Sequence, residues 1–288
     1  MNQIILETKE ISKSFGKVQA LNNVNFYLYK GKIHGLLGEN GAGKSSLMNV
    51  LSGIYQPEKG SVIFEGNTQS NLTPDTAMKL GIGMVHQEFR LIESFSIKDN
   101  LTLSKSNIYE ANFDEAYSKY SNIFSLSVSS ERIISSLSVG EKQKIEIMKL
   151  IFNNSKVMLL DEPTAVLTPQ ETNQLKTSLE RLAKEDDKTI VFITHKLKEI
   201  KELTETIFVM KNGAMVAMDL ETKTVDDKEL INLMMGEVTS SEVKKSNIKG
   251  DEKLVIQDIK YTRNQDKPNF LNGMNISIKS GEILGVAG

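Results

Sequence analysis

One short segment, GENGAGKS at residues 38–45, constrains the fold of this chain more than any other. It matches the pattern GxxxxGK[ST] between an apolar run at 33–37, which predicts a buried strand, and a helical pattern at 44–51. Glycines let backbone N–H groups approach a polyphosphate closely, and a helix N-terminus adds a partial positive charge. The segment therefore predicts a nucleotide-phosphate loop, in which Lys44 reaches the β- and γ-phosphates and the Ser45 hydroxyl binds Mg²⁺.

Two alternatives to a phosphate loop stay open from the residues alone. The segment also fits a glycine-rich turn before an ordinary helix. A dinucleotide-binding fold would need a third glycine after GxGxx, where this chain has Lys44 and Ser45. The residues predicted to bind the nucleotide are Gly38, Glu39, Asn40, Gly41, Ala42, Gly43, Lys44, Ser45 and Ser46.

A second apolar run, at 157–160, ends in the acidic pair Asp161 and Glu162. A buried strand that ends there delivers both carboxylates to the rim of a sheet. We expect Asp161 to hold Mg²⁺ through water and Glu162 to polarise the attacking water as a general base. The alternative is a strand that ends in two solvated acids, but Mg²⁺ on a nucleotide needs an acidic partner.

The order of the predicted elements indicates an α/β fold. Strands are predicted at residues 4–8, 24–29, 33–37, 61–65, 82–85, 157–160, 189–193, 207–210 and 215–218. Helices are predicted at residues 44–51 (with Gly53 as C-cap), 74–80 (with Thr73 as N-cap and Gly81 as its stop), 169–184 and over most of 88–155. Strands that alternate with helices favour a parallel sheet covered by helices on both faces.

Composition excludes several classes of protein. Lys and Arg number 35 against 37 Asp and Glu, which argues against a chain held on nucleic acid by bulk positive charge. The absence of cysteine excludes disulfides, thiolate metal sites and a cysteine nucleophile. No apolar run approaches the roughly 18 residues that span a bilayer, and the N-terminus does not resemble a secretory signal. We expect a cytoplasmic protein that serves a membrane only through a partner.

The sequence repeats its own beginning after a polar stretch. Residues 237–253 are nearly without large apolar groups and predict a linker. After it, LVIQDIKYTR from Leu254 parallels LETKEISKSF from Leu6, and SGEILGVAG at 280–288 parallels KGKIHGLLG at 30–38. We therefore expect a tandem protein whose second unit is cut off, with this chain as a fragment or broken reading frame of it.

Three further segments give the chain a family resemblance. LSVGEKQ at 137–143 is similar to the LSGGQ signature of ABC (ATP-binding cassette) ATPases, while Gln87 matches the Q-loop glutamine and His195 the switch histidine. The resemblance implies a P-loop NTPase ABC cassette fold over residues 1–236, with a mostly parallel sheet, an antiparallel β region and a helical subdomain at about 88–155. Residues 254–288 resemble the start of a second ABC domain.

The resemblance also implies roles for individual residues. The signature residues would meet ATP on a facing cassette; they are Ser138, Val139, Gly140 and Glu141. Gln87 would touch Mg²⁺ or water, His195 would contact the γ-phosphate and hold the attacking water, and Phe15 would stack on adenine. Each has an ordinary alternative: Ser138-x-x-Glu141 is also a capping box, and Phe15 also suits a core. His34 and His86 lack such context and are interpreted as structural.

Two positions depart from the family pattern. Glu141 stands where the family has glutamine, and a carboxylate near a phosphate is unfavourable unless it caps its own helix. Thr168 stands where the family has an aspartate after the acidic strand. Both changes put in doubt the activity of the site that uses this signature.

Several segments, among them GMVHQEF and LDEPTAVLTPQE, are especially similar to those of fused two-cassette ATPases of bacterial nucleoside and simple-sugar importers. This similarity narrows the resemblance to that group of ABC ATPases. It implies ATP and Mg²⁺ as cofactors, permease subunits, a second cassette and a solute-binding protein as partners, no nucleic acid, and a place on the cytoplasmic face of the membrane. Alternatives are a soluble ABC ATPase acting on ribosomes or DNA, and a non-catalytic ATP-binding fragment. We expect the chain alone to bind ATP and hydrolyse it slowly.

Overall fold

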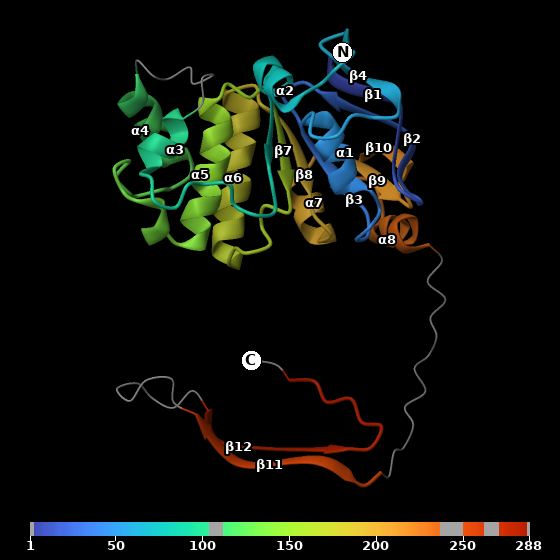
Figure 1. The fold of residues 1–288 in the computed structure, drawn as a ribbon, viewed down its shortest axis with the longest axis vertical. Coiled ribbons are helices and arrows are strands. Elements are labelled where there is room, and N and C mark those ends of the chain that lie inside the picture. The colour runs from blue at the N-terminus through green and yellow to red at the C-terminus, as the bar shows by residue number, and fades with distance from the viewer. Residues whose placement is uncertain (1–2, 104–111, 237–249, 262–270, 287–288) are drawn as a thin grey trace. The chain divides into compact units, whose positions relative to one another are not determined.

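The structure is a computed structural model that describes residues 3–103, 112–236, 250–261 and 271–286 (Figure 1). The chain divides into two compact units, Met1–Val238 and Thr239–Gly288. Most of the predicted linker, residues 237–249, lies outside the described residues. The last two residues predicted as linker, 252 and 253, belong to a strand of the second unit.

A six-stranded, mostly parallel sheet forms the centre of the first unit. Its strand order is β10-β9-β3-β8-β7-β6, and each pair of neighbours is parallel except β9 and β10. The strands are β3 (Ile33–Leu37), β6 (Ile82–Val85), β7 (Val157–Asp161), β8 (Thr189–Ile193), β9 (Thr206–Lys211) and β10 (Ala214–Glu221). All six predicted strands are confirmed, and the bounds of β3, β6 and β8 are those expected from the apolar runs.

A second, antiparallel sheet has the order β2-β1-β4-β5. Its strands are β1 (Ile4–Phe15), β2 (Val18–Tyr29), β4 (Lys59–Phe64) and β5 (Asn67–Gln69). β1 and β2 are each longer than predicted. The alternation of apolar and polar residues breaks at Glu10, which has a φ of +53° at a shift in register between Thr8 and Ile11. A bulge thus interrupts the sequence pattern without ending the strand.

The three helices predicted at 44–51, 74–80 and 169–184 are confirmed. The helices are α1 (Lys44–Leu51), α2 (Pro74–Leu80), α3 (Ile97–Thr102), α4 (Phe113–Ile123), the 3₁₀ helix η1 (Ile134–Ser136), α5 (Val139–Phe152), α6 (Pro169–Glu185), α7 (Leu197–Leu203) and α8 (Asp227–Met235). Thr73, Ser138 and Thr168 each form a reciprocal capping box with the residue three positions later.

Two details of the predicted helices need correction. Residues 88–96 are not helical, so the helical part of 88–155 begins at α3. The C-cap of α1 is Ser52 rather than Gly53. Gly53 follows with a φ of +76°, and a Cβ there would lie 2.4 Å from the carbonyl carbon of Thr73, so only glycine fits.

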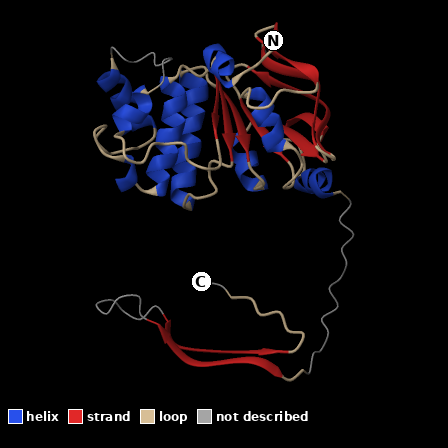
Figure 2. Cartoon of the chain, viewed as in Figure 1, coloured by secondary structure: helices blue, strands red, loops and turns tan. Residues whose placement is uncertain are grey.

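The apolar runs are continuous because both faces of the central sheet are buried. Along β7, Met158 and Leu160 join one core with α4, α5 and α6, while Val157 and Leu159 join a second core with α1 and the antiparallel sheet. Figures 1 and 2 show α5 and α6 beside β7 and β8, with α3 and α4 beyond them. The strands that carry polar groups to the sheet edge are therefore held from both sides.

The second unit contains the hairpin of β11 (Glu252–Tyr261) and β12 (Leu271–Lys279). Its pairing repeats that of β1 and β2: Leu6 faces Leu28 as Leu254 faces Ile278. The bulge is repeated too. The backbone N–H of Glu10 donates to Asn25 Oδ1 at 3.1 Å, and that of Asp258 donates to Asn275 Oδ1 at 2.9 Å. The repeat seen in the sequence therefore extends to register and to individual hydrogen bonds.

Candidate functional site

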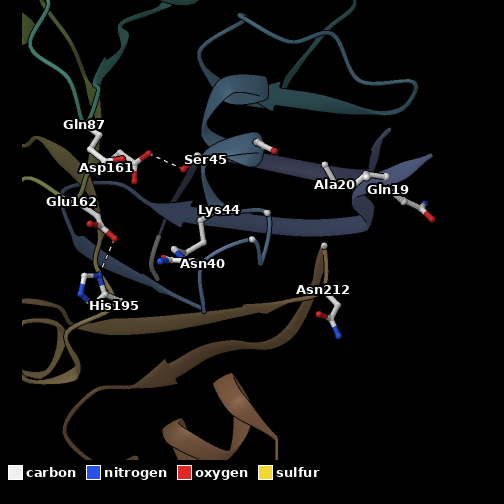
Figure 3. A pocket seen from close by; sticks show the side chains of 15 residues that line it. Gln19, Ala20, Asn40, Lys44, Ser45, Gln87, Asp161, Glu162, His195 and Asn212 are labelled. Atoms are coloured by element: carbon white, nitrogen blue, oxygen red, sulfur yellow. Dashed lines mark hydrogen bonds and ion pairs between the residues drawn. The ribbon is translucent and has the colours of Figure 1, made fainter. Parts of the chain in front are cut away.

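A cavity of about 670 Å³ lies at the carboxyl edge of the central sheet (Figure 3). The strands β3, β8, β7 and β6 are consecutive neighbours and parallel, so the polar residues that follow them meet at this edge. Figure 3 shows Gln87, Asp161, Glu162 and His195 on one side of Lys44. The lining residues are Val18, Gln19, Ala20, Asn40, Gly41, Gly43, Lys44, Ser45, Ser46, Gln87, Asp161, Glu162, His195, Asn212 and Gly213.

The predicted phosphate loop joins β3 to α1 and folds around the Lys44 ammonium. Lys44 Nζ donates hydrogen bonds to the carbonyl oxygens of Gly38 at 2.7 Å and Glu39 at 2.9 Å. Burial lowers the pKa of Lys44, and the charges of Glu162 and Asp161 partly oppose this shift. A buried ammonium that donates its hydrogen bonds to neutral backbone carbonyls is well suited to bind an anion.

Glycine is required within this loop by a close approach of backbone. Gly43 has a φ of +102°, and a Cβ on it would lie 2.6 Å from the carbonyl oxygen of Ala20. The loop is also held by a hydrogen bond of 3.0 Å from the Gly213 N–H to the Ala42 carbonyl. Gly38, Glu39 and Ala42 thus shape the loop, while its other predicted members line the cavity.

Ser45, Gln87 and Asp161, the residues predicted to hold Mg²⁺, all line the cavity. The Ser45 hydroxyl donates to Asp161 Oδ2 at 2.9 Å, and Gln87 lies beside them in the cavity. Burial raises the pKa of Asp161, whereas the Ser45 hydrogen bond lowers it. Hydroxyl and carboxylate oxygens suit Mg²⁺, which takes few protein ligands when it also binds phosphates. The described residues contain no group of three or more His, Asp or Glu that could hold a metal ion.

Glu162 and His195 form a hydrogen-bonded pair at the ends of β7 and β8. His195 Nδ1 lies 2.9 Å from Glu162 Oε1, so the ring donates through Nδ1 and leaves Nε2 for another partner. Glu162 itself has a φ of +49°, an uncommon conformation for a residue with a side chain. Its backbone N–H donates to the carbonyl of Ile193 at 3.0 Å, which fixes the start of this loop to β8.

The signature segment lies at the start of α5 and does not line the cavity. Glu141 Oε2 accepts a hydrogen bond of 2.7 Å from the Ser138 N–H, and the Glu141 N–H donates to the Ser138 hydroxyl at 3.2 Å. The carboxylate that departs from the family pattern is therefore committed to the cap of its own helix. Next to it, a Cβ on Gly140 would lie 2.2 Å from Glu171 Oε1, so this position accepts only glycine without rearrangement.

Phe15 lies at the end of β1 and is not part of either core. Its side chain is 43% exposed, and its ring meets that of Tyr55 edge-on at 5.0 Å. The ring is not among the residues that line the cavity. The stacking of Phe15 on adenine stays a prediction, while its alternative as a core residue is wrong.

The sequence missed one wall of the cavity. Val18, Gln19 and Ala20 at the start of β2 line it together with Asn212 and Gly213, which form the turn between β9 and β10. These segments are almost two hundred residues apart and meet through a hydrogen bond of 2.8 Å from the Asn22 N–H to the Gly213 carbonyl. A turn signal in the sequence gives no indication of which distant strand the turn will contact.

The fold and the phosphate loop define a P-loop nucleotide-binding protein of the α/β class. Within that class, residues 21–165 match the family described as ABC transporter, and the chain belongs to this family. Solved cassettes agree in fold. The ADP conformation of MJ1267, an ATP-binding cassette of an ABC transporter, superposes with a TM-score of 0.71 at 26% identity, over 82% of this chain and 100% of that one. The cassette cbiO1 from Clostridium perfringens gives 0.70 at 26% identity, over 82% and 96%.

Curated relatives include import ATP-binding proteins. The nucleoside import ATP-binding protein NupA of Lactococcus lactis subsp. cremoris (strain MG1363) is 38% identical over 100% of this chain and 57% of its own length. The guanosine import ATP-binding protein NupO of Bacillus subtilis (strain 168) is 38% identical over 99% and 57%. The galactose/methyl galactoside import ATP-binding protein MglA of Clostridium perfringens (strain 13 / Type A) is 35% identical over 99% and 55%. The chain thus spans little more than half of these relatives.

Proposed function

We propose that this chain is the ATP-binding and ATP-hydrolysing part of an ABC importer that takes up nucleosides or simple sugars. The observation that carries the proposal is the convergence of Lys44, Ser45, Asp161, Glu162 and His195 on one cavity. An ammonium, two oxygen ligands for a cation, a carboxylate base and an imidazole are the groups that phosphoryl transfer to water needs. The names of the import relatives support the choice of substrate class.

The residues divide the work of hydrolysis between binding and activation. Lys44 and the amides of the loop bind the β- and γ-phosphates, where the start of α1 contributes a partial positive charge. Ser45, Asp161 and Gln87 would hold Mg²⁺, which neutralises phosphate charge when bound. Glu162 accepts a proton from the attacking water, and His195, held through Nδ1, presents Nε2 toward the γ-phosphate.

The cavity formed by this chain is not lined by any residue of its own signature segment. Ser138, Val139, Gly140 and Glu141 begin α5 and do not line the cavity. Our proposal is that they complete the site of a facing cassette, whose signature in turn completes this one. Closure around ATP would exclude water and align Glu162 with its substrate, and hydrolysis would release the closed state.

The proposed organisation has three parts: an ABC domain at 1–236 with a helical subdomain from α3 to α5, a linker at 237–251, and the start of a second ABC domain at 252–288. The repeated register and the repeated Asn25 and Asn275 hydrogen bonds support the third part. The proposed partners are permease subunits, a second cassette and, through the permease, a solute-binding protein. The proposed place is the cytoplasmic face of the membrane.

Membrane association would then depend on these partners. Among the helices the structure describes, none combines the length and the apolar character that crossing a bilayer requires. Co-purification with a multi-spanning membrane protein would support the importer. Co-purification with ribosomes or DNA would contradict it.

Calorimetry with Mg-ATP tests the binding half of the proposal. We expect the unsubstituted chain to bind and Lys44→Ala to bind about a hundredfold more weakly, because charge-assisted contacts to phosphate are lost. Lys79→Ala is the control, since Lys79 is an exposed lysine paired with Asp75 on α2. Absence of heat with the unsubstituted, folded chain would overturn the proposal.

Turnover tests the catalytic half. We expect Glu162→Gln to bind Mg-ATP normally and to hydrolyse it about a hundredfold or more slowly, because general-base catalysis of this kind contributes a factor of that order. Turnover per chain is also expected to rise with protein concentration, because the site needs a second signature. Equal rates for the two proteins would reject Glu162 as the base, and concentration-independent turnover would reject the facing cassette.

A further inference from the structure

A buried carboxylate outside the cavity links the two segments that carry Glu162 and His195. Glu199 lies in the first turn of α7 and is only 7% exposed. Its Oε2 accepts hydrogen bonds from the Thr164 hydroxyl at 2.6 Å and from the Thr194 hydroxyl at 3.3 Å. Its Oε1 accepts one from Lys196 Nζ at 3.0 Å. A single side chain on a short helix therefore contacts three residues from the ends of β7 and β8.

The hydrogen-bond partners of Glu199 are close neighbours of Glu162 and His195 in the sequence. Thr164 follows Glu162 by two residues, and Thr194 and Lys196 flank His195 on either side. The Thr194 hydroxyl also accepts a hydrogen bond of 3.1 Å from the Lys196 N–H, so the residues on both sides of His195 are hydrogen-bonded to Glu199 and to each other. Neither Glu199 nor either threonine lines the cavity.

Both oxygens of the Glu199 side chain accept hydrogen bonds in this cluster. Two hydroxyls and one ammonium all donate, so the group between them must accept with both oxygens. Thr164 and Thr194 are almost fully buried, and water cannot replace a lost acceptor there without cost. Glutamine keeps the size of the side chain, but its amide nitrogen donates and would face either the hydroxyls or Lys196 Nζ.

We propose that Glu199 is a positioning residue that holds Glu162 and His195 at their hydrogen-bonded separation of 2.9 Å. This inference rests on the proposed function, because the pair matters only if it acts on water and phosphate. Glu199 acts through Thr164 on the loop after β7 and through Thr194 on the loop after β8. Lys44 and Ser45 come from a different segment, so phosphate binding does not depend on Glu199.

The first test uses hydrogen exchange of the full chain without nucleotide. In Glu199→Gln we expect the amides of 162–165 and 194–196 to exchange about tenfold faster, with the amides of 38–46 unchanged. Glu202→Gln is the matched control: it lies on the same helix, makes the same change of charge and breaks ion pairs with Lys176 and Lys198, neither of which lies in either loop. Equal exchange in the two variants would overturn the inference.

A second variant keeps the test independent of any folding defect in Glu199→Gln. Thr164→Val removes a hydroxyl donor and keeps the shape of the side chain. We expect it to speed exchange at 194–196 as well, because loss of one partner loosens the carboxylate that holds the other loop. Exchange that changes only next to residue 164 would contradict the link between the loops.

Steady-state hydrolysis distinguishes a positioning role from a merely structural one, because a positioning role affects kcat more than binding. We expect Glu199→Gln to lower kcat about tenfold or more, with KM and the Kd for Mg-ATP changed less than about twofold. Adding Thr164→Val to Glu199→Gln should lower kcat little further, because both substitutions break the same contact. Equal losses in kcat and in binding, or fully additive losses, would reject the inference. Failure of the unsubstituted chain to bind Mg-ATP would instead reject the proposed function, and the exchange result would stand on its own.

Discussion

The Ser45 hydroxyl donates a hydrogen bond of 2.9 Å to Asp161 Oδ2 and so joins the first turn of α1 to the end of β7. Burial raises the pKa of Asp161, because its charged form loses solvation, and the Ser45 hydrogen bond and the Lys44 charge only partly restore it. The carboxylate therefore opposes folding while it keeps a negative charge beside the phosphate loop. This is the expected compromise at a site that binds a cation.

Asp161→Asn separates these two effects. In the presence of a chelator, we expect the variant to melt at a higher temperature than the unsubstituted chain, because a buried carboxylate is replaced by a neutral group of the same shape. Its hydrolysis of Mg-ATP is expected to fall about a hundredfold, the upper range for an outer-shell metal partner. Thermal unfolding with and without Mg-ATP measures the first effect, and phosphate release the second.

The control for this substitution is Asp75→Asn, an exposed carboxylate that pairs with Lys79 on α2. It makes the same chemical change away from the cavity, and we expect neither hydrolysis nor the effect of Mg-ATP on melting to change. An unchanged hydrolysis rate in Asp161→Asn would mean that this carboxylate has no part in holding the metal.

His34 makes the free energy of unfolding of the chain depend on pH in the acidic range. It is fully buried, with Nδ1 against Thr206 Oγ1 at 2.7 Å and Nε2 accepting from the Tyr29 N–H at 2.9 Å. Burial lowers the pKa of His34 to about 4, from an unfolded value near 6.5. The neutral ring therefore contributes stability that is complete above the unfolded pKa and is lost as the pH falls from about 6.5 toward 4. The full loss is on the order of 3 kcal/mol.

Urea unfolding at pH 7, 6 and 5 measures this loss, with His34→Gln as the comparison. The variant is expected to be less stable at pH 7 but to lose less stability on acidification. Asp161 and Glu146, whose pKa values burial raises, act in the opposite direction in both proteins and cancel in the difference. Parallel pH curves for the two proteins would show that His34 does not titrate in this window.

The sequence predicted those parts of the site that closely follow a strand. Asp161 comes directly after an apolar run, His195 lies two residues after one, and Lys44 ends the loop that follows another, and such runs reveal the end of a buried strand. The wall formed by Gln19 and Asn212 was missed, because its residues meet only through the pairing of distant strands. Glu199 was missed for a different reason: in KLKEIKEL it is one of several alternating charges, and its burial depends on how α7 packs.

Gly140 is the position in the signature segment where a larger side chain meets the closest neighbouring atom. A Cβ there would lie 2.2 Å from Glu171 Oε1, and the other oxygen of that carboxylate caps α6 by accepting from the Thr168 N–H at 2.9 Å. We expect Gly140→Ala to displace Glu171 at a cost of about 1 kcal/mol, the value of a helix cap, which offsets the stability of up to about 1 kcal/mol that alanine gains over glycine in a helix. Urea denaturation measures the net change, which we expect to lie within about 0.5 kcal/mol of zero. Val139→Ala, at an exposed neighbouring position, is the control and leaves Glu171 in place. A gain of about 1 kcal/mol in Gly140→Ala would show that Glu171 moves freely.

Substitutions of Glu141 separate the effect of its hydrogen bond, which caps α5, from the effect of its negative charge. Its carboxylate accepts from the Ser138 N–H at 2.7 Å, which a glutamine side-chain oxygen can also do and an alanine cannot. We expect Glu141→Ala to lower the free energy of unfolding by about 1 kcal/mol and Glu141→Gln by less than half of that. If the carboxylate also opposes a facing phosphate, Glu141→Gln will raise turnover at high protein concentration. Because the structure commits this side chain to its own helix, we expect no rise, and a clear increase in concentration-dependent hydrolysis would show that the cap opens when two cassettes meet.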